Sequence, residues 1–248
     1  MSLVTLSQQD GVARLTLARA GRANALTAEL LEDLHAALDR LGNPRALVLA
    51  GEGRNFCTGG DVARFADEVA AGNGPAYAAG IVGALNRAIL RLAALRFPVI
   101  ARVQGALTGG ALGLVLAADL VVMTPEAFVQ PFYAVVGFAP DGGWTRMLAD
   151  RIGAHRVRAI HLLNQRITAL DAQSLGLAQA VSAQPDAVIA QWLATLASHD
   201  PGSIAATKRL LSDDLERTLE AERTAFVAAV DRAETRAGMA RFLTPGRG

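Results

Sequence analysis

Two glycine pairs, each at a junction between an apolar β-like run and a helical segment, are the first candidates for chemistry. The pair at 109–110 follows the run 98–103, and the pair at 59–60 follows the run 46–50. Amides at a helix start have no partner inside the helix, and the helix dipole adds positive charge there. Two such donors converging on one oxygen would form an oxyanion hole.

A structural interpretation of the second pair competes with this one. Glycine at 109–110 could serve only to let a helix pack closely. Residues 111–118 are apolar on every side, which predicts a buried helix, and the Thr108 hydroxyl is expected to cap it.

Asp141 stands in Pro140-Asp-Gly-Gly-Trp144, a stretch whose residue types allow two interpretations. A carboxylate can act as a base and then, once protonated, as an acid. The alternative is turn chemistry, because Pro-Asp-Gly-Gly favours a turn and Asp favours a helix N-cap.

The elements that must position these residues follow from periodicity. Strands are expected near Val4 and over 12–17, then a helix from Thr27, its cap, to about Leu41. A further helix is expected over 62–70, where Asp61 could be an N-cap. Strands and helices alternate to about Val181, and after Pro185 the pattern is helical only, which indicates an α/β core and a helical tail with a soft boundary near 190.

Composition excludes several classes of protein. Of 248 residues, 52% are hydrophobic and 19% charged, which is typical of a globular chain, and the formal charge of +1 with scattered basic residues argues against nucleic-acid binding. Cys57 is the only cysteine and the four histidines lack metal spacing, so we expect no disulfide and no metal. The start lacks a secretory signal and no apolar run is long enough for a membrane span, so a soluble cytoplasmic protein is expected.

An ordered set of motifs resembles the crotonase (enoyl-CoA hydratase/isomerase) superfamily over nearly the whole chain. The matching segments are Arg22-Ala-Asn-Ala-Leu26, Phe56-Cys-Thr-Gly-Gly-Asp61, 105–119, Phe128-Val-Gln-Pro131, Val136-Gly-Phe-Ala-Pro-Asp-Gly-Gly143, Ser174-Leu-Gly-Leu-Ala178, Ala206-Thr-Lys-Arg-Leu210 and Gly238-Met-Ala-Arg-Phe242.

The resemblance implies an α/β fold, a crotonase-like spiral of ββα units with a C-terminal helical trimerisation region. Residues 1–190 would form the catalytic core, and 191–248 would build a homotrimer or a dimer of trimers. It also implies an acyl-CoA thioester as substrate and no separate cofactor, since coenzyme A is part of the substrate.

Carried over residue by residue, the resemblance makes the N–H groups of Gly60 and Gly110 the oxyanion donors. Both glutamates of the family's hydratases are absent. Gly113 occupies the first position, and either Phe132 or Tyr133 occupies the second, depending on loop register.

Asp141 falls where the family's enoyl-CoA isomerases carry an acidic base and where its chlorobenzoyl-CoA dehalogenase has a nucleophilic Asp. The remaining contacts expected along the coenzyme A are Arg22, Ala23, Thr58, Asp61 and Val62. Those expected around the acyl group are Phe132, Tyr133 and Trp144. For Phe138, core packing is expected instead.

The leading functional prediction is an enoyl-CoA double-bond isomerase in which one Asp shuttles a proton and two backbone amides hold the enolate. The alternatives are a hydratase-like, thioester hydrolase or decarboxylase activity, or a non-catalytic acyl-CoA binder, which two missing glutamates would suit.

Overall fold

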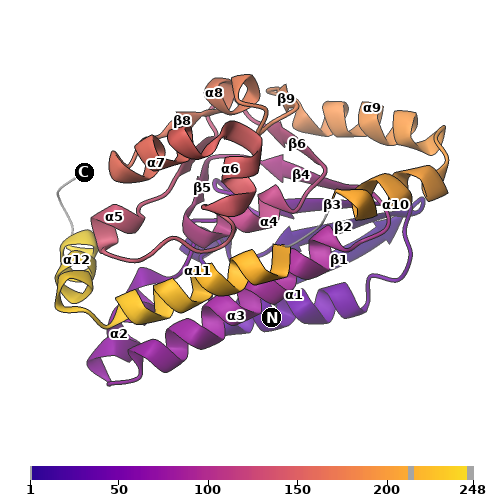
Figure 1. The fold of residues 1–248 in the computed structure, drawn as a ribbon. Helices are drawn as coiled ribbons and strands as arrows, with labels where there is room; N and C mark the ends of the chain where they lie inside the picture. The colour runs from indigo at the N-terminus through magenta and orange to yellow at the C-terminus, as the bar shows by residue number, and fades with distance from the viewer. Residues whose placement is uncertain (1, 212–214, 245–248) are drawn as a thin grey trace.

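The computed structural model describes residues 2–211 and 215–244, and strands alternate with helices through its first two thirds (Figure 1). The strands are β1 (Val4–Gln9), β2 (Val12–Leu17), β3 (Ala46–Gly51), β4 (Val99–Val103), β5 (Ala106–Thr108), β6 (Leu120–Met123), β7 (Phe128–Gln130), β8 (Ile167–Thr168) and β9 (Ala180–Val181). The helices are η1 (Ala20–Arg22), α1 (Ala28–Asp39), α2 (Val62–Ala70), α3 (Gly74–Ala93), η2 (Gly109–Ala111), α4 (Leu112–Leu116), α5 (Tyr133–Val136), α6 (Arg146–Ile152), α7 (Ala154–Leu162), α8 (Ala169–Ser174), α9 (Pro185–Ala197), α10 (Pro201–Leu210), α11 (Leu215–Val230) and α12 (Ala233–Leu243).

The strands form two sheets. A six-stranded sheet has the order β1-β2-β3-β4-β6-β9, with β1 antiparallel to β2 and the other pairs parallel. A smaller sheet has the order β5-β7-β8. An isolated bridge between Cys57 and Leu107 brings the loop after β3 beside β5. The chain passes from the larger sheet to the smaller one between β4 and β5, and the bridge places both glycine turns where the two sheets meet.

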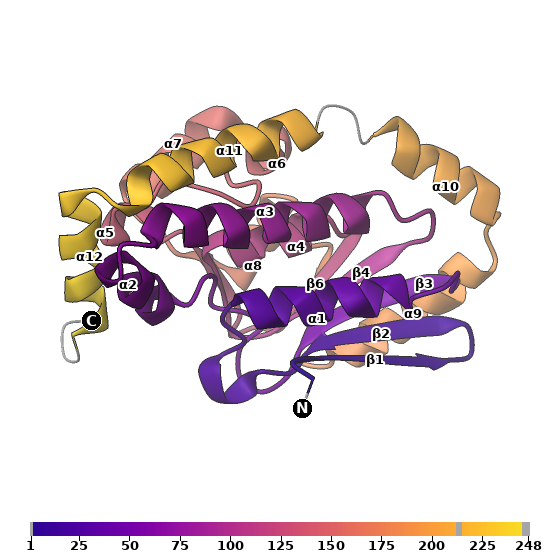
Figure 2. The same cartoon turned by 90° about the horizontal axis from the view of Figure 1, so that it is seen from below.

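Helices cover both faces of the larger sheet (Figure 2). Ile189 of α9 packs on one face against Val48, Ile100 and Val122. The opposite face packs against α1 and α3 in the main core. Burial on both faces explains why β3 is almost uniformly apolar, as the sequence predicted.

Local predictions hold for most elements. The Thr27 hydroxyl accepts a hydrogen bond from the Leu30 N–H at 3.3 Å and caps α1, and α2 begins at Val62 as expected. The expected buried helix over 111–118 is confirmed as a buried segment, although α4 itself is short.

The predicted Thr108 cap is wrong. Its side chain caps nothing, because the chain enters a 3-10 turn through Gly109 at φ 53° instead of starting an α-helix there. Glycine tolerates this left-handed conformation without a Cβ clash.

The C-terminal helices fold back on the core except for α10. Helix α11 lies along α3, and α12 contacts α2 and α5. Helix α10 buries none of its residues. The expected boundary near residue 190 falls inside α9. A division of the chain into a core and a C-terminal region stays a prediction. Within the described ranges no helix is both long and apolar enough to cross a bilayer, and no cluster of His, Cys, Asp or Glu is arranged to hold a metal ion.

Candidate active site

The two glycine turns, which lie far apart in sequence, are in direct contact. A Cβ at Gly59, where φ is 76°, would lie 2.8 Å from the Thr108 carbonyl oxygen. A Cβ at Gly109 would lie 3.5 Å from the Gly59 Cα. Only glycine lets two backbones approach this closely at these dihedral angles. The two predicted donor segments are thus brought together.

The expected oxyanion donors have no competing acceptor nearby. Across residues 2–211 and 215–244, neither the Gly60 nor the Gly110 N–H donates to a backbone or side-chain oxygen of the chain. Their neighbours do: the Asp61 N–H donates to the Leu26 carbonyl at 3.1 Å. Gly110 is buried and Gly60 half-buried, and amides in such places are rarely left without acceptors, so these two are suited to a ligand oxygen.

A cavity of about 470 Å³ opens at these turns. Most of the predicted site residues line it, together with apolar side chains from α3, α5, α11 and α12. The predicted residues that line it are Arg22, Thr58, Gly60, Asp61, Val62, Gly110, Phe132, Tyr133 and Asp141; Phe138, expected only to pack in the core, lines it too and also contacts Phe65 and Phe226.

Trp144 does not line the cavity, contrary to the sequence prediction. It is fully buried behind Tyr133, with ring centroids 6.1 Å apart. Its indole N–H donates to the Gly109 carbonyl at 2.6 Å. This bond holds the ring against the turn at Gly109 and Gly110, the candidate oxyanion turn. Trp144 therefore supports the turn and is not part of the cavity wall.

Ala23 also lies outside the cavity wall. It has a left-handed φ of 50°, and its carbonyl accepts a hydrogen bond from the Thr58 N–H at 3.2 Å. Its predicted contact with coenzyme A stays a prediction, and any such contact would be made at the cavity mouth beside Thr58.

Asp141 is buried, with 5% of its surface exposed, and lies against the oxyanion turn. A Cβ at Gly110 would lie 2.9 and 3.0 Å from its two carboxyl oxygens. The Tyr133 hydroxyl donates to Oδ1 of Asp141 at 2.6 Å. Burial raises the pKa of Asp141 to about 7, the Tyr133 hydrogen bond opposes this, and the charge of Glu222 adds to it. A carboxyl group with this pKa can both take and return a proton near neutral pH.

The helix-cap alternative for Asp141 is not what the structure shows. Helix α6 begins at Arg146, and its N-cap position, Thr145, makes no side-chain cap. The Asp141 carboxyl is instead bound by Tyr133 and faces the cavity.

The position of the first hydratase glutamate has no room for a side chain. A Cβ at Gly113 would lie 2.4 Å from both the Gly142 carbonyl oxygen and Cδ1 of Ile89. Gly142 has a φ of 63° and packs on the Gly110 backbone. The loop that carries Asp141 therefore fills the space that a glutamate at 113 would need.

Asp61, the other carboxylate that lines the cavity, is held by arginines. Its Oδ2 accepts hydrogen bonds from Arg19 at 3.1 Å and Arg22 at 3.4 Å, and its side chain caps no helix. Burial alone would raise its pKa, but the Arg19 hydrogen bond and both positive charges leave it lowered. Asp61 is therefore suited to organising the cavity mouth and poorly suited to accepting a proton.

The sequence analysis assigned no role to two residues that fix these loops, although Asn24 lies in one of its motifs. Glu222 of α11 accepts hydrogen bonds from the N–H groups of Gly143 at 2.6 Å and Thr145 at 2.9 Å, and from the Thr145 hydroxyl. The Asn24 side chain donates to the Glu52, Asn55 and Phe56 carbonyls. A lone acid on the apolar side of a helix was the only available signal for Glu222.

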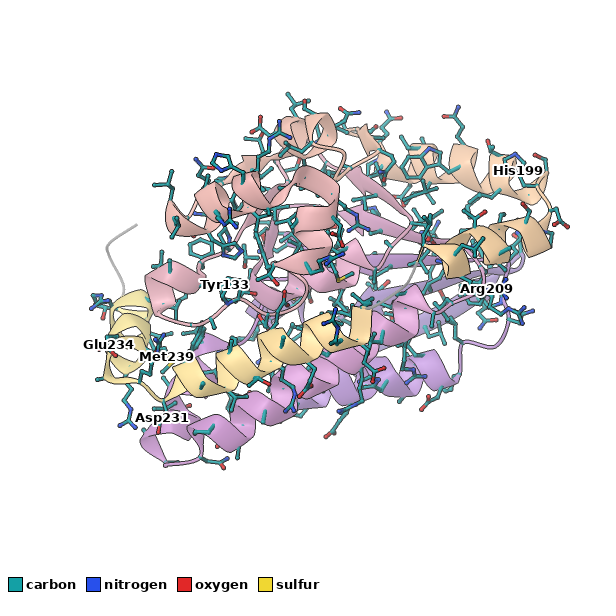
Figure 3. The ribbon with its side chains drawn as sticks, viewed as in Figure 1. Tyr133, His199, Arg209, Asp231, Glu234 and Met239 are labelled. Atoms are coloured by element: carbon teal, nitrogen blue, oxygen red, sulfur yellow. The ribbon has the colours of Figure 1, made fainter. Side chains whose placement is uncertain are left out.

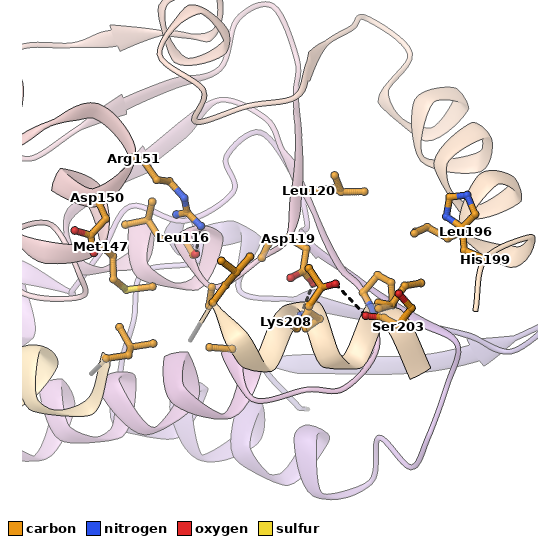
Figure 4. Close-up of a pocket in the computed structure, with 18 of the residues that line it drawn as sticks. Leu116, Asp119, Leu120, Met147, Asp150, Arg151, Leu196, His199, Ser203 and Lys208 are labelled. Atoms are coloured by element: carbon orange, nitrogen blue, oxygen red, sulfur yellow. Dashed lines mark hydrogen bonds and ion pairs between the residues drawn. The ribbon is translucent and has the colours of Figure 1, made fainter. Parts of the chain in front are cut away.

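A second, larger cavity of about 980 Å³ lies between α10 and the body (Figure 4). It is lined by the Lys208–Asp119 ion pair and by apolar side chains such as Leu116 and Leu120. It contains neither a glycine turn nor Asp141, so size alone does not make it the reactive site.

Comparison with known proteins identifies the family. The profile of the enoyl-CoA hydratase/isomerase family matches residues 7–246. The chain is 32% identical over 214 residues to "Probable enoyl-CoA hydratase echA6" of Mycobacterium bovis, covering 86% of this chain and 83% of that protein. It is 28% identical over 255 residues to a Bacillus subtilis protein described as an enoyl-CoA hydratase/isomerase, YngF, covering 97% and 95%.

Solved structures agree on the fold. An enoyl-CoA hydratase from Bacillus halodurans superposes with a TM-score of 0.90 at 23% identity, covering 97% of this chain and all of that one. Pseudomonas aeruginosa PA4980 gives 0.76 at 30% identity, covering 89% and 98%. The chain therefore belongs to the enoyl-CoA hydratase/isomerase family and has the crotonase fold.

Proposed function

We propose that the protein moves the double bond of a 3-enoyl-CoA ester into conjugation with its thioester. The observation that carries this is a single carboxyl group, Asp141, buried against the oxyanion turn without a cationic partner in the described part of the chain. Asp61 also lines the cavity, but it stands just before α2 and is paired with Arg19 and Arg22.

The proposed reaction uses one group twice. Ionised Asp141 takes a proton from C2, and the electron pair moves through the thioester carbonyl to give a dienolate. The N–H groups of Gly60 and Gly110 hold its oxygen, where one such donor is worth roughly 3 kcal/mol. Protonated Asp141 then returns the proton at C4, which restores the carboxylate and leaves the 2,3-double bond.

Hydration is the less suitable reaction. Syn-addition of water would need a second group to orient and activate it. Gly113 has no room for a glutamate, and Phe132 and Tyr133 carry no carboxylate. The hydratase names of the relatives support the family assignment and leave open which reaction this chain performs.

The coenzyme A would enter at the mouth of the cavity. Arg22 is largely exposed beside Asp61 and is suited to pairing with phosphate, while Thr58 and Val62 line the adjoining wall. The aromatic residues Phe132 and Phe138 line the cavity and would contact the acyl group. No cofactor besides the substrate's own coenzyme A is needed for this reaction.

The test is the variant Asp141→Asn. It keeps the size of the side chain and removes the proton carrier, so kcat for 3-enoyl-CoA isomerisation should fall by about 10²–10⁴-fold. Binding of the CoA ester, measured by calorimetry, should persist. Conjugation is followed by ultraviolet absorbance.

Asp67→Asn, the same change at an exposed position of α2, is the control and should keep full activity. Turnover retained in Asp141→Asn would refute the role of Asp141. If the unaltered protein hydrates 2-enoyl-CoA or hydrolyses the thioester instead, those alternatives replace isomerisation. Binding with no turnover of either ester would identify a non-catalytic binder.

A further inference from the structure

Tyr133, predicted only as a wall of the acyl pocket, makes its closest polar contact with the reactive carboxyl group. Tyr133 is the first residue of α5, is buried, and points into the interior of the molecule (Figure 3). Its hydroxyl is 2.6 Å from Oδ1 of Asp141 and 3.1 Å from the Asp141 backbone carbonyl. A phenol has one proton to donate and can also accept.

These two contacts can serve both protonation states of Asp141. When the carboxyl group is ionised, the hydroxyl donates to Oδ1. When Oδ1 is protonated, it can donate to the phenol oxygen, and the phenol proton can turn to the backbone carbonyl. The hydroxyl therefore keeps a partner in both states, which a buried polar group requires. Its bond to the ionised carboxylate is charge-assisted and stronger, so the hydroxyl favours that state.

The arrangement leaves the second carboxyl oxygen unoccupied. Among the described residues, Oδ2 of Asp141 accepts no hydrogen bond. It is not one of the fully buried polar atoms without a partner, so it is accessible from the cavity. It lies 2.9 Å from where a Cβ at Gly110 would be, on the side of the oxyanion turn. Oδ2 is thus the oxygen available to a substrate proton.

The ring of Tyr133 is fixed by its neighbours. It packs edge-on against Trp144, and His161 of α7 packs on it at a tilt of 33°, with centroids 5.7 Å apart. Trp144 is in turn tied to the Gly109 carbonyl. The hydroxyl is therefore held in one place relative to the oxyanion turn.

We propose that Tyr133 is a positioning residue for the proposed isomerisation: its hydroxyl holds Oδ1 of Asp141, aims Oδ2 at the substrate, and favours the ionised, reactive form of the carboxyl group near neutral pH. The inference rests on the proposed function for its kinetic test and on the geometry alone for its spectroscopic test.

The electrostatic surroundings agree with this role. The titratable groups facing Asp141 are Tyr133 from α5 and Glu222 from α11, with His161 behind the tyrosine ring. Burial raises the pKa of Tyr133 well above its usual value, so the phenol keeps its proton and cannot itself be the base. Burial lowers the pKa of His161, so this ring is neutral at pH 7 and supplies no positive charge. The phenol is then the only group among these that stabilises the ionised carboxyl group.

The first test is Tyr133→Phe, which removes the hydroxyl and keeps the ring stack. Loss of a donor to the ionised form raises the pKa of Asp141, so the acidic limb of the kcat–pH profile should move up by about one pH unit. At pH 7, kcat should fall about fivefold, because the ionised fraction of Asp141 falls from about one half to about one tenth; KM should change little, and activity should return at higher pH. A loss of kcat that no pH restores, or an unmoved limb, would overturn the proposal.

Tyr77→Phe is the matched control, because the chain has only two tyrosines. The Tyr77 hydroxyl is also buried but has no hydrogen-bond partner, and its ring packs on Phe65. Its removal should leave the pH profile unchanged. A limb shift equal to that of Tyr133→Phe would show a general effect of tyrosine removal and overturn the proposal.

A second measurement does not depend on turnover. In protein labelled with ¹³C at aspartate carboxyl groups, the Asp141 signal, assigned with Asp141→Asn, should titrate about one pH unit higher in Tyr133→Phe. In Tyr77→Phe protein carrying 3-fluorotyrosine, whose phenol is a stronger donor, it should titrate lower. Shifts in these directions support the pair even if the protein isomerises no 3-enoyl-CoA, whereas an unmoved signal refutes it.

Discussion

At the residue scale, the burial that suits Asp141 to proton transfer also opposes folding at neutral pH. An ionised carboxylate packed against α5 and α11 loses its hydration, and the Tyr133 hydrogen bond and the backbone of Asp141 compensate in part. Active sites commonly hold such groups in environments that favour the neutral form. The structure thus predicts a conflict between reactivity and stability at one side chain.

The conflict can be measured as a pH dependence of stability. The pKa of Asp141 is about 7 in the folded chain and near 3.8 when unfolded, so its contribution is fully present below pH 4 and is lost as the pH rises to about 7. Within this window the loss is roughly 1.4 kcal/mol per pH unit. The free energy of unfolding of Asp141→Asn, relative to that of the unaltered protein, should therefore be higher at pH 8 than at pH 4. Denaturant unfolding at both pH values measures this difference.

The comparison with Asp67→Asn separates this effect from a general change of charge. That side chain is exposed, so its variant should follow the unaltered protein at every pH. A stability difference between Asp141→Asn and the unaltered protein that stays constant from pH 4 to pH 8 would contradict the raised pKa.

At the scale of elements, the loop that carries Asp141 is fastened by a helix from the C-terminal region. Glu222 of α11 accepts from two backbone amides and one hydroxyl of the 143–145 turn, and Gly142 packs on the Gly110 backbone from the other side. The loop is held between α11 and the oxyanion turn. Helix α11 of the C-terminal region therefore helps to hold the candidate site in place.

Glu222→Gln tests this fastening. In the unaltered protein, both carboxylate oxygens of Glu222 accept hydrogen bonds. In the variant, an NH₂ group replaces one of them, so at least one buried donor loses its acceptor, which costs about 1–3 kcal/mol. We expect a lower melting temperature and a kcat reduced about tenfold, because the Asp141 loop is displaced.

Glu220→Gln, on the same helix, is the control. Glu220 is exposed and pairs with Arg223, and such surface pairs contribute little. Its variant should behave as the unaltered protein. Full activity and stability in Glu222→Gln would show that the loop holds its shape without the helix.

At the scale of the whole molecule, α10 leaves its apolar side chains exposed in a single chain. It buries none of its residues, and Leu210 and Leu211 at its end are 72% and 83% exposed. Exposed apolar side chains in a cluster commonly mark an interface. Together with the family membership, this supports the proposal of a homotrimer or a dimer of trimers.

Sedimentation tests the assembly. The mass should be three or six times the 25.9 kDa of one chain. The double variant Leu210→Asp and Leu211→Asp should shift it toward the single chain while circular dichroism keeps its helical signal, because charges at an apolar interface are costly to bury. A single-chain mass for the unaltered protein would exclude the assembly.

Neighbouring residues were enough to predict many local features. The Thr27 cap, the start of α2 at Val62, the buried apolar run of β3 and the glycine turns depend on interactions within a few residues. Capping, periodicity and backbone freedom act over one or two turns of chain, so sequence pattern carries them. The order of motifs likewise identified the family.

Only the tertiary structure decided how these parts meet. The expected Thr108 cap fails, and Trp144 supports the oxyanion turn instead of lining the cavity. Tyr133 and Asp141 are only 8 residues apart but meet because both are packed under α11, and Glu222 contacts the same loop from 79 residues away. Such contacts depend on which distant segments pack together and on the dehydration that packing imposes, and no short stretch of sequence contains that information.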